Sequence, residues 1–236
     1  MLKLPSIRHE FYAKVSQVVA AADQSRLHLR RDLHLTRKLW HMCMGVVILA
    51  IFMSGISKHM SLLLLGGFLT FFLLFETARL KNPFLNQFAV RIMGPLMRSH
   101  EVHRLSGIPY YLAAALAAVA IFPRPVAVLS LLYLALGDPV ASLFGILYGD
   151  RSLRFSNGKS LVGTGAGVAI CFLVTLVYLS GMRLDLSTSL LLALIGGIAG
   201  GTAEMLPFEI DDNFTIPVIS GFVLWLAFIL LGIGSN

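Results

Sequence analysis

The stretch LGDPVASLFGILYGDRSLRFSNGKSLVGTGAG, residues 136–167, holds the features that decide the fold. Asp138 sits among small residues inside an apolar segment, and a basic, glycine-containing loop separates that segment from a second apolar one. A carboxylate at the centre of a membrane-spanning helix costs roughly 2.5–3.5 kcal/mol on insertion scales, so it indicates a functional site. We therefore predict that the chain is a membrane scaffold for this loop and for acidic partners elsewhere.

Composition supports a membrane protein. The 236 residues are 57% hydrophobic and 13% charged, which is more apolar surface than one soluble core of this size normally buries. The formal charge of +7 could suggest a nucleic-acid partner. However, the basic residues lie in the N-terminal 38 residues and in short loops between apolar segments, as membrane topology requires. We predict an all-α fold, a polytopic transmembrane helix bundle, and no nucleic-acid partner.

Hydropathy divides the chain into an arm and a membrane domain. Residues 1–38 predict a basic amphipathic arm, and residues 39–236 a transmembrane domain. About seven spans are predicted in that domain, at residues 39–56, 60–75, 108–122, 126–148, 161–182, 189–206 and 215–233. We expect a kink or break in the fourth span at Gly137, Asp138 and Pro139.

Loop charges predict the orientation of the bundle. With the N-terminus inside, the inner segments carry sixteen Lys and Arg residues, and the outer side carries only Lys58, Arg124 and Arg183. The positive-inside rule therefore favours a cytoplasmic N-terminus. The loops then gathered on the cytoplasmic face are residues 76–107, 149–160 and 207–214. Polar groups that converge on one side indicate an enzyme that uses a cytosolic donor.

The segment after Gly137 has a small and polar face. In a helix, Asp138, Ser142, Gly145 and Gly149 would form one stripe that lets a neighbouring helix or a ligand approach closely. A packing face would explain the glycines without explaining the carboxylate. Asp138 is therefore a candidate catalytic residue.

The following loop is a candidate phosphate site. Lys159 lies between Gly158 and Ser160, just before the glycine-rich helix start that contains Gly163. Backbone N–H groups at a helix N-terminus and a lysine together suit a phosphate. The Gly-Lys-Ser sequence resembles the end of a Walker A motif, but the first glycine of that motif is missing. Membrane anchoring remains the alternative role for the loop arginines.

Acidic residues gather again from the end of the sixth span onward, at Glu204, Glu209, Asp211 and Asp212, followed by Asn213. Oxygen ligands of this kind could hold a hard divalent ion such as Mg²⁺, although the spacing does not match an EF-hand. A solvated turn is the alternative, but Glu204 precedes the turn and is expected to face the bundle. At the first span, Arg37 and Lys38 suit snorkelling anchors that enter the membrane interface.

Five segments, in order, resemble the polyprenol kinase family of membrane lipid kinases. This family includes dolichol, phytol and farnesol kinases and the CTP-dependent diacylglycerol kinase of fungi. The segments are RKLWH (37–41), EVHRLSGIPYYL (101–112), LGDPVASLFGILYG (136–149), GKSLVGTGAG (158–167) and AEMLPFEIDDNFTIP (203–217). Pro139 departs from the threonine or serine that often follows the Gly-Asp pair.

The resemblance implies an enzyme, a phosphotransferase that moves the γ-phosphoryl group of CTP or ATP to the hydroxyl of a lipid alcohol. The acceptor would be a polyprenol or dolichol, phytol or diacylglycerol, and Mg²⁺ would be the cofactor. Implied catalytic residues are Asp138, Lys159 and Glu204. Implied nucleotide contacts are Arg37, Lys38, Gly158, Ser160 and Gly163. Implied metal ligands are Asp138, Glu204, Asp211, Asp212 and Asn213.

The short chain favours the bacterial or phytol-kinase-like branch of the family. Residues 39–236 would be the catalytic domain. We expect the protein in a bacterial inner or plasma membrane, with its site on the cytoplasmic face. Two alternatives remain. A CTP-dependent lipid cytidylyltransferase would act on similar partners, but its C-terminal signature is not visible. A small membrane transporter with Asp138 as coupling site would predict internal repeats, and no convincing repeat is present.

Overall fold

The structure, a computed structural model, describes residues 35–155, 157–205 and 210–233. Most of these residues are helical, and the single extended pairing among them joins Arg154 and Ser160. The helices are α2 (Leu35–Met53), α3 (Lys58–Lys81), α4 (Pro83–Met93), α5 (Gly107–Ile121), α6 (Arg124–Leu132), α7 (Asp138–Tyr148), α8 (Leu161–Ser180), α9 (Leu186–Thr202) and α10 (Asp212–Leu230). Short 3-10 turns occupy Gly94–Leu96, Ser99–Val102, Gly149–Arg151 and Ala203–Met205. The predicted all-α class is confirmed.

The predicted membrane spans are also present. Six helical stretches of the described residues are long and apolar enough to cross a membrane, and α5 is a shorter apolar helix of 15 residues. The six are α2, α3, Arg124–Arg151, α8, Leu186–Met205 and α10. Each coincides with a predicted span to within a few residues, and α5 coincides with the remaining one.

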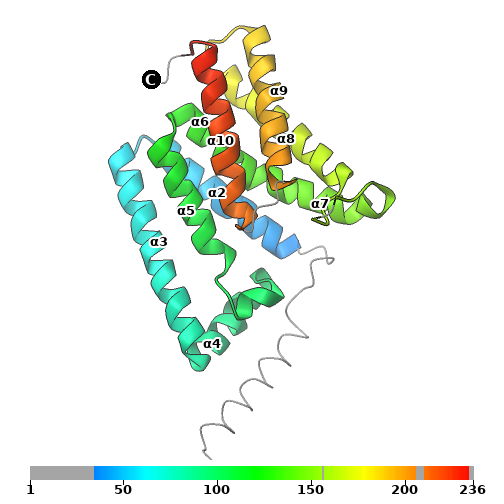
Figure 1. Cartoon of the computed structure of the whole chain (residues 1–236). Coiled ribbons are helices and arrows are strands. Elements are labelled where there is room, and N and C mark those ends of the chain that lie inside the picture. The colour runs from blue at the N-terminus through cyan, green and yellow to red at the C-terminus, as the bar shows by residue number, and fades with distance from the viewer. Residues whose placement is uncertain (1–34, 156, 206–209, 234–236) are drawn as a thin grey trace, which may run out of the picture.

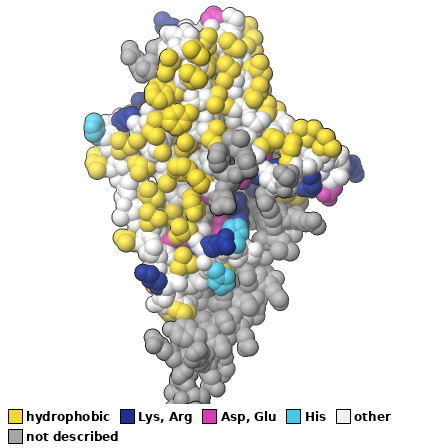
Figure 2. All heavy atoms as spheres, viewed as in Figure 1, with side chains coloured by type: hydrophobic (Ala, Val, Ile, Leu, Met, Phe, Trp, Pro, Cys, Tyr) yellow, Lys and Arg dark blue, Asp and Glu magenta, His cyan; other side chains and the backbone are white. Residues whose placement is uncertain are grey.

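The helices pack around α6. In Figure 1, α5 and α10 lie beside α6, α3 lies on the outer side of α5, and α8 and α9 pair on the other side. Every residue of α6 from Pro125 to Leu131 is buried, so this helix forms the centre of the core. Figure 2 shows hydrophobic side chains over the outer surface of the spanning helices, as a lipid-facing surface requires.

The fourth span differs from the prediction of a kink or break at residues 137–139. Helix continues from α6 into α7 through a π-helical turn, Tyr133–Gly137, in which the Asp138 N–H donates to the Tyr133 carbonyl. A wider turn of this kind frees a backbone carbonyl. The Leu134 carbonyl oxygen lies 2.9 Å from His41 Nε2, which must donate because a carbonyl can only accept. The irregularity therefore precedes Asp138 and is satisfied from α2.

Helix α4 turns away from α3 at its end (Figure 1). The side chain of Asn82 caps it, accepting from two backbone N–H groups of its first turn. Phe84, Phe88 and Ile92 are exposed on one face, while Ala89 and Val90 on the opposite face are buried. This pattern suits a helix that lies at a membrane surface.

Two predicted segments fall partly beyond the described residues. Residues 1–34 of the predicted arm lie outside them, while Arg37 and Lys38 already belong to α2, which starts before the predicted residue 39. Residues 206–209, in and next to the predicted loop 207–214, also lie outside. The cytoplasmic orientation of the N-terminus stays a prediction.

Candidate functional site

A cavity of about 1160 Å³ opens where α2, α7, α8, α10 and residues 98–105 meet. This volume exceeds that of most small-molecule sites, so more than one ligand can fit. The cavity brings together ten of the predicted site residues from four separate parts of the sequence. They are Arg37, Lys38, Asp138, Gly158, Lys159, Ser160, Gly163, Glu204, Asp211 and Asp212.

One side of the cavity, here called the glycine wall, consists of α7, residues 149–160 and the first turn of α8. In this wall, the backbones of α7 and α8 are in contact. A Cβ added at Gly163 would lie 2.7 Å from the Ala141 carbonyl oxygen and 3.0 Å from the Cα of Gly145, and one at Gly149 would lie 3.1 Å from Ser160 Oγ. The predicted small-residue stripe on α7 therefore packs against α8. That packing accounts for the glycines and leaves the side chain of Asp138 in the cavity.

Asp138 begins α7 and is followed by proline, which suits the first turn of a helix because its missing N–H needs no partner there. Its Oδ2 lies 4.0 Å from His41 Nε2, and its side chain is 20% exposed. The π-helical turn fixes the direction of this side chain, since it immediately precedes Asp138. Asp138 is thus held at the cavity surface by α2 and by its own span.

Lys159 joins two acidic segments. Its Nζ lies 2.6 Å from Glu204 Oε2 and 2.8 Å from Asp212 Oδ2. The preceding Gly158 has φ +79°, a left-handed conformation that favours glycine in this tight turn. Burial alone would favour the neutral amine, but Glu204 and Asp212 raise the pKa of Lys159 above its ordinary value. The loop therefore presents a permanent cation, already paired with carboxylates.

The N-terminus of α8 was predicted to offer N–H groups to a phosphate. Ser160 Oγ accepts from the Gly163 N–H at 3.1 Å, so serine caps the helix. The Leu161 N–H donates to the Leu153 carbonyl, and the Val162 N–H lies 3.4 Å from a serine hydroxyl of the same loop. An anion at this end would have to displace these partners.

The opposite side, here called the ion-pair wall, consists of the first turn of α2 and residues 96–106. Arg37 Nη1 donates to the Leu96 carbonyl at 2.7 Å, and the Arg37 guanidinium binds both carboxylate oxygens of Glu101 at 3.1 and 3.2 Å. Arg98 Nη1 lies 3.3 Å from Asp211 Oδ2. Burial would lower the pKa of Arg98, but Asp211 and Glu101 raise it. Side-chain charges, rather than backbone contact, form this wall.

Sequence reasoning treated residues 76–107 as a connection and missed this wall. The cavity is lined by Arg98, His100 and Arg104. Glu101 does not line it but forms an ion pair with Arg37. The segment EVHRL at residues 101–105, which carries part of the family resemblance, was the available signal.

Asp138 lies beside His41, and the other four predicted metal ligands separate into three places. Glu204 and Asp212 meet at Lys159, whereas Asp211 binds Arg98 and caps α10. Asn213 is buried, donates to the Gly107 carbonyl at 3.4 Å and does not line the cavity. Among the residues that the structure describes, no group of three His, Cys, Asp or Glu side chains is placed to hold a metal ion.

A smaller donor set still fits Mg²⁺. Protein sites for this ion often use one or two carboxylates together with substrate phosphates and water. The carboxylates of Glu204 and Asp212 converge within bonding distance of one ammonium group, and both line the cavity. The pair suits that role, and Asn213 lies outside it.

Comparison with known proteins gives several relatives. The chain is 31% identical to CTP-dependent diacylglycerol kinase 1 of Saccharomyces cerevisiae over 206 residues, which cover 78% of this chain and 70% of the yeast protein. It is 31% identical to the protein of the same name from Schizosaccharomyces pombe over 160 residues, 64% of this chain and 73% of that protein. It is 27% identical to a chloroplastic farnesol kinase of Arabidopsis thaliana over 211 residues, 84% and 66% of the two chains. No family model and no solved structure matches.

Proposed function

The chain belongs to the polyprenol kinase family of integral membrane lipid kinases, and we propose that it transfers the γ-phosphoryl group of CTP to the hydroxyl of a membrane lipid alcohol. ATP is the alternative donor. The acceptor class comprises polyprenols or dolichol, phytol and diacylglycerol. The observation that carries the proposal is one cavity, at the end of a membrane-type bundle, where Asp138 faces cations contributed by three separate segments.

Phosphoryl transfer depends on positioning and on stabilisation of phosphate charge more than on covalent catalysis. Arg37 and Lys38 enter the cavity from α2, and Arg98 enters from the ion-pair wall. We assign these three residues to the phosphates of the donor. Lys159 faces them across the cavity, and its two carboxylate partners make it the organiser of the acidic side.

Asp138 is the proposed general base. The hydroxyl proton of the lipid passes to its carboxylate while the lipid oxygen bonds to the γ-phosphorus. The bond from that phosphorus to the β–γ bridging oxygen breaks, so a nucleoside diphosphate leaves. The position of Asp138, on a spanning helix and at the cavity surface, supports this role because a lipid hydroxyl reaches the site from the membrane.

Glu204 and Asp212 are the proposed Mg²⁺ ligands. When bound, the ion neutralises charge on the donor phosphates. The ammonium of Lys159 keeps the two carboxylates together and limits their mutual repulsion. The distribution of Lys and Arg supports an orientation in which the cavity opens to the cytoplasm.

The test uses the purified protein in detergent with Mg²⁺ and a panel of polyprenol, phytol, farnesol and diacylglycerol. CTP and ATP are supplied with label in the γ- or the α-phosphate. We expect γ-label in at least one lipid, with release of the nucleoside diphosphate. Nucleotide binding without label in any lipid would contradict the proposal. Transfer of α-label with release of pyrophosphate would instead identify a cytidylyltransferase.

A further inference from the structure

Two charged residues that the proposed chemistry does not use are buried near the end of α3. Glu76 is 3% exposed and Arg79 is 1% exposed, so both residues are almost completely shielded from water. Burial of charge is costly unless each group is fully bonded, and a charged pair is rarely needed for stability alone. Stability alone therefore does not explain why this charged pair is buried here.

Arg79 donates hydrogen bonds to the loop at residues 101–104. Its guanidinium binds both Glu76 oxygens at 2.9 and 2.7 Å and the Asn86 side chain at 2.9 Å. Its other acceptors are three backbone carbonyls of residues 101–104. These are Glu101 at 2.9 Å, Arg104 at 2.9 Å and Val102 at 3.5 Å. The planar guanidinium offers five donors in a rigid fork, whereas an ammonium offers three from a single atom.

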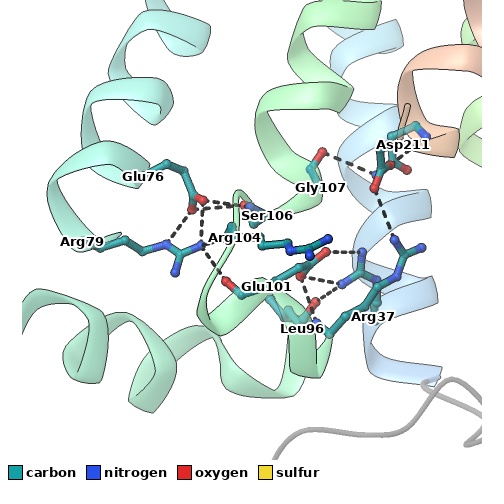
Figure 3. Close-up of polar contacts among 11 residues, drawn as sticks. Arg37, Glu76, Arg79, Leu96, Glu101, Arg104, Ser106, Gly107 and Asp211 are labelled. Atoms are coloured by element: carbon teal, nitrogen blue, oxygen red, sulfur yellow. Dashed lines mark hydrogen bonds and ion pairs between the residues drawn. The ribbon is translucent and has the colours of Figure 1, made fainter. Parts of the chain in front are cut away.

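Glu76 holds the far end of the same loop. Its Oε2 accepts from the Ser106 N–H at 2.8 Å, and its Oε1 accepts from the Ser106 hydroxyl at 3.1 Å. Residues 101–106 are therefore tied to α3 from both halves of the pair, as Figure 3 shows.

The opposite side of this loop faces the cavity. Glu101 links the two sides, because its carbonyl accepts from Arg79 while its carboxylate binds Arg37 and the Arg98 N–H. A continuous series of contacts runs from the buried pair to Arg37. Arg98, His100 and Arg104 reach the cavity from the same short stretch.

We infer that the Glu76–Arg79 pair is a positioning unit for donor binding, which holds residues 98–106 so that Glu101 orients Arg37 and the loop presents Arg98 to the donor phosphates. Neither member of the pair touches the donor. The inference rests on the proposed function for the identity of the ligand, and on the described contacts for the mechanism.

The variant Arg79→Lys keeps the charge but loses the fork that holds the carbonyls. We expect its Kd for a fluorescent CTP analogue to rise at least 10-fold. We expect its KM for CTP to rise similarly, with kcat and the KM for lipid changed less than 3-fold. Arg91→Lys is the matched control, because Arg91 is exposed on α4, and it should leave every constant unchanged.

Hydrogen exchange gives a readout that does not need catalysis. Amides of residues 98–106 should exchange at least 10-fold faster in Arg79→Lys, while amides of α8 and α9 exchange as in the wild type. A uniform rise in exchange over the whole bundle, or unchanged exchange in the loop, would overturn the inference.

A second variant separates positioning from folding. Glu101→Gln keeps the carbonyl that Arg79 binds but weakens the hold on Arg37, so it should also raise the Kd of the CTP analogue. If both variants act through one series of contacts, the double variant should be no more than about 2-fold worse than the worse single one. Additive losses would refute the series. If the wild type binds CTP but labels no lipid, the proposed function fails while exchange and binding still decide this inference.

Discussion

The two walls of the cavity are made in opposite ways. The glycine wall depends on backbones that approach until no methyl group fits, as at Gly163 against Ala141. The ion-pair wall depends on charged side chains that reach across the bundle, as from Arg37 to Glu101. Added side-chain volume should destabilise the glycine wall, and salt should leave it unchanged. The exposed parts of the ion-pair wall should tolerate added volume and weaken as salt is added. Each wall can therefore be tested with a perturbation that spares the other.

The largest effect should come from Asp138, the proposed general base on the glycine wall. Asp138→Asn keeps the shape of the side chain but removes the base, so we expect kcat to fall by about 10³-fold. Steady-state transfer of γ-label measures this. Asp185→Asn is the control, because Asp185 does not line the cavity and contacts only its own helix start, which asparagine caps equally well. An Asp138→Asn enzyme with wild-type kcat would remove Asp138 from the chemistry.

The next effect concerns Lys159. Lys159→Gln leaves Glu204 and Asp212 without their cation, and we expect a loss of about 2 kcal/mol in unfolding free energy, reduced because Asp212 is 30% exposed. Thermal unfolding in detergent measures the loss, with the exposed Lys81→Gln as control.

The pH dependence of that loss has a definite sign. Because the folded pKa of Lys159 is raised, its stabilisation is fully present below the unfolded-state pKa of about 10.4 and disappears only as pH rises through the folded value. The difference between wild type and Lys159→Gln should thus not decrease as the pH rises from about 6 to 9. A difference that decreases with rising pH within this range would contradict the charged pairing.

A methyl group tests the glycine wall directly. Gly163→Ala puts a Cβ against backbone and should cost about 1–3 kcal/mol of stability. Gly165→Ala, two residues along the same helix, meets nothing within 4 Å. It should be neutral or stabilise by up to about 1 kcal/mol. Equal effects of the two variants on thermal unfolding would mean that the backbones do not touch.

The smallest effect should come from the partly exposed end of the ion-pair wall. Arg98 and Asp211 pair at 3.3 Å with 40% and 15% of their side chains exposed, so Arg98→Gln should cost less than about 1 kcal/mol. The cost should vanish at about 1 M salt, where screening acts within about 3 Å. The cost of Gly163→Ala should be the same at low salt and at about 1 M salt.

Local patterns were sufficient to predict one wall and insufficient for the other. Apolar runs predicted the spans, and the short separations between Asp138, Gly145, Lys159 and Gly163 brought the glycine wall together. By contrast, Arg37 and Glu101 are 64 positions apart, and Arg98 and Asp211 are 113 apart. Charge pairs at such separations depend on how helices pack, which spacing in the sequence does not encode. Asn213 was misjudged for the same reason, because its amide faces α5 rather than the cavity.

The π-helical turn at Tyr133–Gly137 has a consequence for how this span works as a helix. It amounts to one inserted residue, so the two halves of the span run at different helical phases. Relative to a regular α-helix of the same sequence, everything beyond this turn is offset by about 100°. The hydropathy of the span would be the same without the offset, yet Asp138 would then point away from His41. The wider turn therefore separates a passive membrane anchor from a span that carries a site.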